Sequence, residues 1–342
     1  MGGDSLTTAD HGDGATISTV HPDILQTHIL TRLDGPTLAT AACASPHLHA
    51  LSTQETLWRQ ICNRTWPSTA DPRVRRLISA FPAGHRSFYS DSFLAVDHRR
   101  RSPPYLRRRR PPQPSAYVIS AVDIQYQDRI ILSKVHVAET GSDPFRVDLL
   151  DPKESVPMNV NLEIKDITCL SNLQENLSLS WIVIDPTRAR AANVSSRSPV
   201  LVKRNWLSND VELRYATVLS GEKRGEMVQC LVVVTCDGGG GLMVKEVRLH
   251  VEDMEGKKLG WKSLEAAVEG GRKRRGERGE EREMYKGWWR EERERRHRKR
   301  RRENRREMMF MVTNLFLLLS FLAFVGIKFF QLTWFYAVKW LV

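Results

Sequence analysis

Residues 21–62 read HPDILQTHILTRLDGPTLATAACASPHLHALSTQETLWRQIC, and this stretch decides the N-terminal fold. Its apolar residues fall at helical spacings, and proline stands near helix starts, where no backbone N–H is needed. The first predicted helix begins at Pro22, and Asp34-Gly35-Pro36 ends it and begins the second. The motif Ser45-Pro46 is expected to end the second helix.

A third helix is predicted in the same stretch. Ser52 and Glu55 have the spacing of a capping box, in which each side chain bonds the backbone N–H of the other residue. Leu57, Trp58 and Ile61 would form the apolar face of this helix. A module of about 40 residues buries too little apolar surface to be stable alone. The apolar surface that stays exposed therefore predicts a binding partner. The alternative is an ordinary helical domain with these residues as its own core.

These motifs resemble an F-box, a three-helix module that docks on the Skp-type adaptor of a cullin–RING ubiquitin ligase. The resemblance rests on the Pro-Asp start, the Ile-Leu pair, the region of Leu38 and Cys43, and the Leu-Trp end. Two departures are His21, where a leucine is usual, and residues 42–46, where Val-Cys-Lys-x-Trp is usual. The resemblance implies a non-catalytic subunit that recruits substrates. It also implies an adaptor-binding surface of Pro22, Ile24, Leu25, Ile29, Leu33 and Leu38.

Downstream of the helices, the sequence changes to short strand-like runs separated by turn signals such as residues 141–144. Many short strands at this spacing predict an all-β, sandwich-like domain over residues 115–271. A short helix over residues 261–268 is expected at its edge. The predicted strands are Tyr117–Ile124, Arg129–Val137, Phe145–Leu150, Leu177–Ile184, Val211–Leu219, Val228–Cys236 and Leu242–Val251.

The amino-acid sequence of this β region resembles that of a family of plant F-box proteins whose C-terminal region is uncharacterised. The similar stretches are SAVDI at 120–124, PFRVDLLD at 144–151, SWIVIDP at 180–186 and VEDM at 251–254. The resemblance covers about residues 18–270. A fainter similarity, to the phloem-lectin-type sandwich, implies a groove for glycan or peptide and a second hypothesis, a lectin-like binder. A sandwich core explains Trp181 and Trp206 equally well.

The net charge of +12 is concentrated outside the predicted folded parts. Residues 96–114 hold seven basic and one acidic side chains, and residues 272–306 hold 18 and 8. Residues 115–271 hold 18 basic and 22 acidic side chains, which argues against a basic nucleic-acid-binding domain. Arginine and proline make 96–114 a predicted stiff linker, and the polar residues 1–19 are expected to be disordered.

The fold class is therefore α+β and multidomain, with no catalytic or cofactor site indicated. Residues 20–95 comprise the F-box and further helices, expected after Pro72 and from Ser87 to Val96. No nucleophile, carboxylate pair or metal-binding set stands out, and the Gly238–Gly241 run lacks the Gly-Lys-Ser/Thr of a phosphate loop. Because the cysteines are odd in number and none forms a CxxC motif, we expect buried, reduced thiols. They are Cys43, Cys62, Cys169, Cys230 and Cys236.

The C-terminal part, residues 307–342, contains an apolar segment. Residues 308–327 read MMFMVTNLFLLLSFLAFVGI and carry no charge. At about 1.5 Å per residue, a helix of this length spans the ~30 Å hydrocarbon core of a bilayer. We therefore predict a transmembrane helix. Its predicted membrane-spanning residues include Met308, Leu317, Leu318, Leu319 and Ile327.

The basic segment 272–306 would be a juxtamembrane helix, with i,i+4 pairs such as Glu294–Arg298 on its surface. Because basic residues concentrate before the span, the positive-inside rule places residues 1–306 in the cytosol. The expected protein is tail-anchored in an intracellular membrane, with lipid, a Skp-type adaptor, a cullin and an unknown protein substrate as partners. The alternative is a soluble nuclear or cytoplasmic protein in which the apolar segment is a buried core helix.

Overall fold

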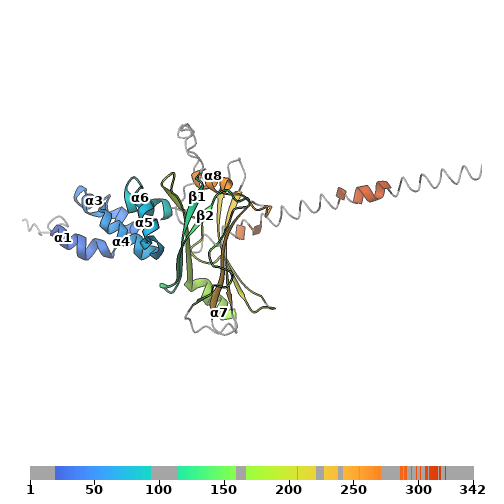
Figure 1. The fold of residues 1–342 in the computed structure, drawn as a ribbon, viewed down its shortest axis with the longest axis horizontal. Helices are drawn as coiled ribbons and strands as arrows, with labels where there is room; N and C mark the ends of the chain where they lie inside the picture. The colour runs from blue at the N-terminus through green and yellow to red at the C-terminus, as the bar shows by residue number, and fades with distance from the viewer. Residues whose placement is uncertain are drawn as a thin grey trace, which may run out of the picture. The chain divides into compact units, whose positions relative to one another are not determined.

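The computed structural model describes residues 20–93, 115–158, 167–205, 207–220, 227–237, 242–253 and 255–270, and parts of 286–320. The chain divides into two compact units, residues 1–285 and residues 286–342. The first unit contains a helical module and two β-sheets (Figure 1). Helices together with antiparallel sheets confirm the α+β class.

The helical module occupies residues 20–93. Its elements are α1 (Pro22–Ile24), η2 (Leu25–Ile29), η3 (Leu30–Arg32), α2 (Gly35–Ala41), α3 (Pro46–Ser52), α4 (Glu55–Thr65), η4 (Pro67–Ala70), α5 (Pro72–Ile78) and α6 (Gly84–Phe93). Ser45 caps α3, because its hydroxyl accepts a 3.2 Å hydrogen bond from the backbone N–H of Leu48. Helix α2 already ends at Ala41, so the Ser45-Pro46 motif does not end it, and the motif instead begins α3. Helix α3 was not predicted from the sequence.

The predicted capping box at the start of α4 is wrong. The N-cap is Gln54, which makes no side-chain capping bond. The Glu55 carboxylate instead accepts a 3.1 Å hydrogen bond from the backbone N–H of His85, and it contacts the imidazole of the same residue. The Glu55 carboxylate therefore satisfies a backbone N–H at the start of α6 that has no partner within its own helix. Because His85 is 30 positions away in the chain, local spacing cannot reveal this contact.

Two antiparallel sheets follow the helical module. Sheet A has the strand order β2-β1-β5-β6, and sheet B has the order β3-β10-β9-β8-β7, with β4 paired to β10. The strands are β1 (Tyr117–Tyr126), β2 (Arg129–Glu139), β3 (Arg146–Asp148), β4 (Val156–Pro157), β5 (Leu177–Asp185), β6 (Arg190–Asn193), β7 (Leu201–Arg204), β8 (Val211–Ser220), β9 (Met227–Asp237) and β10 (Met243–Asp253). All seven predicted strands are present, whereas the short β4, β6 and β7 were missed.

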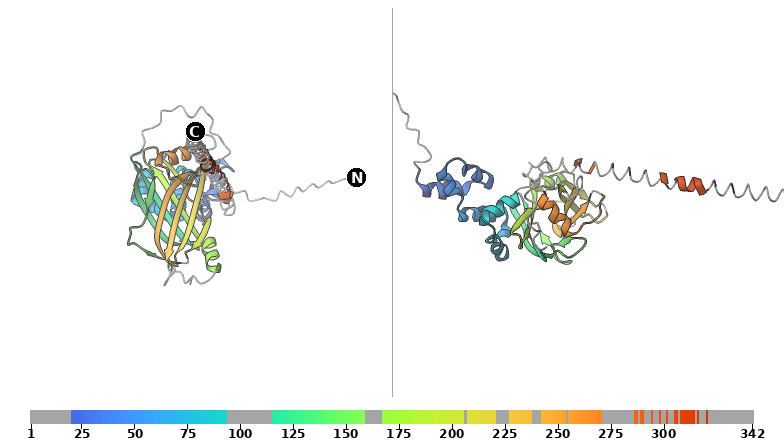
Figure 2. Two further views of the ribbon diagram at one scale, coloured as in Figure 1. Left: turned by 90° about the vertical axis from the view of Figure 1, so that its right-hand side faces the viewer. Right: turned by 90° about the horizontal axis from the view of Figure 1, so that it is seen from above.

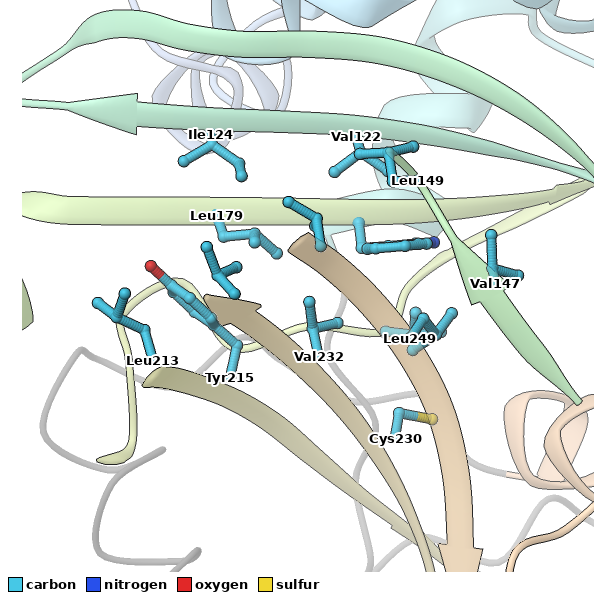
Figure 3. Close-up of a cluster of buried hydrophobic side chains, with 14 of the residues drawn as sticks. Val122, Ile124, Val147, Leu149, Leu179, Leu213, Tyr215, Cys230, Val232 and Leu249 are labelled. Carbon is cyan, nitrogen blue, oxygen red and sulfur yellow. The ribbon is translucent and has the colours of Figure 1, made fainter. Parts of the chain in front are cut away.

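A hydrophobic core lies between the two sheets (Figure 3). Val122 and Leu179 of sheet A face Tyr215 and Val232 of sheet B across this core. Trp181 is fully buried there, and its indole N–H donates a 3.0 Å hydrogen bond to the Ser120 hydroxyl. The expected core position of Trp181 is confirmed, and Trp206 lies outside the described residues.

Two helices lie at opposite ends of this sandwich, α7 (Ile167–Asn176) and α8 (Trp261–Gly270) (Figures 1 and 2). The predicted short helix is confirmed as α8, which inserts Trp261, Leu264 and Ala267 into the core. Because these side chains fill the core at that end, α8 closes it. Helix α7 was not predicted from the sequence.

The outer face of sheet A packs against the helical module. Ile119 of β1 and Ile184 of β5 belong to the same buried cluster as Trp66 and Phe88 of the module. Strands β1 and β5 are therefore covered on both faces, which explains their nearly continuous apolar sequences. The linker prediction separated the helices from the sandwich, yet the two share one core.

The second unit is described only in part. Its described residues are helical, and Glu294 and Arg298 form the predicted ion pair at 3.0 Å. Among the described residues, no helix combines the length and the apolar character needed to cross a membrane. Met308 is exposed, and the other named span residues, Leu317, Leu318, Leu319 and Ile327, lie outside the described residues. The membrane span stays a prediction.

Candidate adaptor-docking surface

The first helical segment, α1–η2–η3, has one buried side and one exposed side. Leu25 and Leu30 are buried in the module core. Ile24 and Ile29 are 50% and 42% exposed, which is unusual for large aliphatic side chains. We call Pro22, Ile24 and Ile29 the docking face, since all three are exposed on this segment.

A π-helical turn shapes the docking face. Residues 25–29 are π-helical, and the backbone N–H of Leu30 bonds the carbonyl of Leu25, five positions earlier. Such a turn brings side chains five positions apart onto one side, and Ile24 and Ile29 have this spacing. The Thr27 hydroxyl donates a 2.6 Å bond to the carbonyl of Asp23 beside the turn. The local geometry therefore gathers the two exposed isoleucines.

Contacts with later helices hold this segment in place. The guanidinium of Arg64 on α4 donates hydrogen bonds of 3.1 and 2.7 Å to the carbonyls of Thr31 and Leu33. Gln26 also contacts Gln54 through their side-chain amides. Arg64 thereby satisfies carbonyls at the end of η3 that have no partner within the helix. This role of Arg64 was not predicted, because nothing in the local sequence distinguishes Arg64 from other surface arginines.

The six predicted adaptor-binding residues do not share one surface. Pro22, Ile24 and Ile29 are exposed, and Leu33 is half-buried. Leu25 and Leu38 are both 0% exposed and belong to the module core. The apolar stripe read from the sequence therefore mixed core leucines with surface isoleucines. Leu25 and Leu38 are core residues in this structure, and the adaptor-binding role of the six residues stays a prediction.

A second exposed apolar side chain lies on the turn between β7 and β8. Leu207 is 79% exposed. Two hydrogen bonds join described residues of this turn: the Asn205 N–H donates to the Asp210 carbonyl at 2.8 Å, and the Leu207 N–H donates to the Asn205 side-chain oxygen at 2.9 Å. The strand β7 contacts α7, so the turn belongs to the end of the sandwich that α8 does not close. An apolar pair, Trp206-Leu207, between polar turn residues was the available sequence signal.

The described residues offer little for metal or thiol chemistry. None of them forms a group of three or more His, Cys, Asp or Glu side chains that could hold a metal ion. All five cysteines are free, and Cys62, Cys230 and Cys236 are buried. Burial raises the pKa of Cys230 and Cys236 to about 12, so both are thiols at neutral pH. Cys43 is exposed and Cys169 half-buried, against the expectation that all five would be buried.

Three proteins of Arabidopsis thaliana are similar to this chain over most of its length. F-box protein At2g27310 is 43% identical over 272 residues, which cover 74% of this chain and 77% of the relative. F-box protein At3g44326 is 44% identical, with coverages of 80% and 78%. Probable F-box protein At2g36090 is 42% identical, with 71% of each chain covered. This chain belongs to the F-box protein family.

Because the match covers 80% of this F-box protein, it includes the sandwich and at least part of the helical module. It confirms the resemblance to plant F-box proteins. No family model matches the chain, and no solved structure matches it. The fainter similarity to a phloem-lectin-type sandwich is not shown.

Proposed function

We propose that this F-box protein recruits protein substrates to a cullin–RING ubiquitin ligase. Its helical module docks on a Skp-type adaptor, and its sandwich holds the substrate. Membership of the F-box family supports the adaptor partnership in general. In this role the rest of the ligase supplies the chemistry of ubiquitin transfer, and this chain supplies two binding surfaces.

The docking face is the observation that carries the proposal. Ile24 and Ile29 stay half-exposed on a segment whose other side is fixed in the core. Removing apolar area from water stabilises a complex by roughly 25 cal/mol per Å². A partner that covers these side chains gains this free energy without unfolding the module, because Leu25 and Leu30 already hold the segment.

The first prediction tests the docking face. The double change Ile24→Ala and Ile29→Ala in the full chain should weaken binding to the Skp-type adaptor. Full burial of an aliphatic side chain is worth about 1.5–3 kcal/mol, and these two are half-buried already, so we expect about a 10- to 100-fold increase in Kd. Isothermal titration calorimetry with purified adaptor measures it.

Two further variants control this measurement. Ser90→Ala changes an exposed residue of α6 and should leave the Kd unchanged. Leu25→Ala removes a core side chain and should lower the free energy of unfolding by about 2–5 kcal/mol, visible in thermal melts. A double variant that binds as tightly as the wild type, with an unchanged melt, would contradict the docking assignment.

The second prediction concerns substrate selection by the end of the sandwich near α7. Loops on rigid scaffolds commonly carry recognition, and this turn presents the exposed Leu207, whose backbone N–H is held by Asn205. Leu207→Asp should reduce the amount of ubiquitinated substrate in cells while the adaptor Kd and the melting temperature stay unchanged. Quantitative proteomics of ubiquitin-modified peptides, with and without the variant, measures this reduction.

A matched control lies at the other end of the sandwich. Ser142 is exposed on the turn between β2 and β3, and Phe145 just after this turn packs on Trp261 of α8. Ser142→Asp should leave the pattern of ubiquitinated proteins as in the wild type. Equal losses for Leu207→Asp and Ser142→Asp would show that the end near α7 has no special role.

A further inference from the structure

A carboxylate lies buried where the helical module meets sheet A. Asp123 stands in the middle of β1 and is only 2% exposed. Its Oδ1 accepts hydrogen bonds of 2.9 Å from the Ser68 backbone N–H and 2.7 Å from the Ser133 hydroxyl. Its Oδ2 accepts a 2.5 Å bond from the Ser68 hydroxyl. One side chain thus joins η4 of the module to β1 and β2 of the sandwich.

The hydrogen bonds of Asp123 with Ser68 and Ser133 favour one position of η4 on sheet A. Burial raises the pKa of the Asp123 carboxyl, and the hydrogen bonds from Ser68 and Ser133 oppose this rise. A buried carboxylate without donors costs far more free energy than an apolar side chain at the same position. An apolar contact tolerates sliding, whereas the two hydrogen bonds from Ser68 weaken steeply as Ser68 moves away from the carboxylate or out of line with it.

Two further polar contacts, on β2 and β6, join the helical module to sheet A on either side of Asp123. Arg73 of α5 donates a 3.3 Å hydrogen bond to the Val135 carbonyl of β2, and Asp71 holds its guanidinium at 3.0 Å. Arg190 of β6 lies 3.5 Å from the Asp91 carboxylate of α6. The module therefore contacts β2, β1 and β6, strands that span the full width of sheet A.

We propose that Asp123 is a positioning residue that fixes the orientation of the F-box helices on the sandwich. The substrate-binding sandwich would then face the ligase in one orientation, which sets the lysines that ubiquitin can reach. This inference rests on the proposed function for its purpose, whereas the fixed orientation itself is a property of the chain alone. The sequence signal is the single charge in an apolar strand, SAVDI at residues 120–124.

The experiment measures a distance between the two parts of the full chain. Cys43 is exposed on the helical module, and Lys203→Cys adds a second exposed thiol on β7 of sheet B. Cys169→Ser removes the half-buried thiol. Spin labels on the two thiols, measured by pulsed electron paramagnetic resonance, should give one narrow distance distribution. With Asp123→Ala the distribution should become at least twofold broader.

Three variants separate positioning from general destabilisation. Asp123→Asn keeps an acceptor for the Ser68 N–H and should retain the narrow distribution. Ser133→Ala removes only a bond within sheet A and should also retain it. Ser68→Ala removes one of the two bonds between module and sandwich and should broaden the distribution partially, which serves as the test if Asp123→Ala does not fold. A narrow distribution in folded Asp123→Ala, or a broad one in the wild type, overturns the proposal.

A reconstituted ligase provides the functional measurement. Each variant should bind the adaptor within about twofold of the wild type, because the docking face is unchanged. Mass spectrometry of ubiquitin transferred to the lysines of the chain itself should show a wider set of modified sites for Asp123→Ala and the wild-type set for Asp123→Asn. An unchanged set for Asp123→Ala would overturn the positioning role. Failure of the wild type to bind the adaptor would overturn the proposed function and leave the distance result standing.

Discussion

At the scale of single residues, Asp34 shows how one side chain begins a helix beside the docking face. Its Oδ1 accepts a 3.0 Å hydrogen bond from the Thr37 backbone N–H at the start of α2. The hydrogen bonds from Thr37 lower the pKa of the Asp34 carboxyl, and the positive charge of Arg64 adds to this effect. The same arginine binds the end of η3, so this corner of the module depends on both residues.

The third prediction follows from this cap. Asp34→Ala should lower the free energy of unfolding by about 1 kcal/mol, whereas Asp34→Asn should be nearly neutral because asparagine also caps helices. Since the pKa is lowered in the folded state, the charge stabilises the fold above the ordinary carboxyl pKa. That contribution is lost as pH falls through the lowered value. In urea titrations, Asp34→Ala should lower the free energy of unfolding by the same amount at pH 7 and at pH 5. A difference between wild type and variant that has already vanished at pH 5 would refute this role of Asp34.

At the scale of elements, the contact between α2 and α6 depends on a missing side chain. Gly35 at the start of α2 is buried against the ring of Tyr89, and a Cβ there would overlap the ring atoms. Tyr89 cannot move away easily, because its ring packs on Trp58 and Trp66 with centroids 5.3 and 5.1 Å apart. Glycine is therefore required here for close approach, although it is a poor helix former.

The fourth prediction weighs these two effects. Alanine normally gains about 1 kcal/mol over glycine inside a helix, but forcing extra atoms into a packed core costs about 1–3 kcal/mol. We expect Gly35→Ala to be destabilising overall, with the melting temperature lowered by a few degrees. Gly141→Ala is the matched control, because no atom lies within 4 Å of its added Cβ. A stabilised Gly35→Ala variant would show that α2 can move away from Tyr89.

At the scale of the whole molecule, the first unit consists of the helical module, sheet A and sheet B, packed in that order. Sheet A takes part in both hydrophobic cores, one on each face. A change in its central strands therefore affects the helical module and the sandwich together. This arrangement is the physical basis for expecting the two parts to move as one body.

The fifth prediction concerns the apolar segment 308–327, which we propose to be a membrane anchor. Replacing Leu317, Leu318 and Leu319 by arginine should abolish insertion, because each arginine near a helix centre costs about 2.5–3.5 kcal/mol on the insertion scale. Replacement of the same residues by valine is the control and should preserve insertion. Alkaline carbonate extraction of membranes from expressing cells measures the outcome. A wild-type chain that carbonate extracts fully would refute the anchor.

The residue pattern alone determined much of this molecule. The periodicity of apolar residues and the turn signals located seven strands and α8. Long apolar runs bounded by turns, such as those of β1 and β5, indicate buried strands. The F-box motifs pointed to the family that the Arabidopsis relatives then showed. These features are local, so neighbouring residues in the chain suffice to specify them.

The tertiary structure alone decided which face of each element is buried. Leu25 and Ile24 are adjacent and equally apolar, yet only contacts with later helices make Leu25 core and leave Ile24 exposed. The short strands β4, β6 and β7 form because longer neighbours offer free edges, and their own sequences carry too few residues to show a period. Glu55 and Asp123 bind partners 30 and 55 positions away in the chain, so the roles of both carboxylates depend on packing that spacing cannot encode.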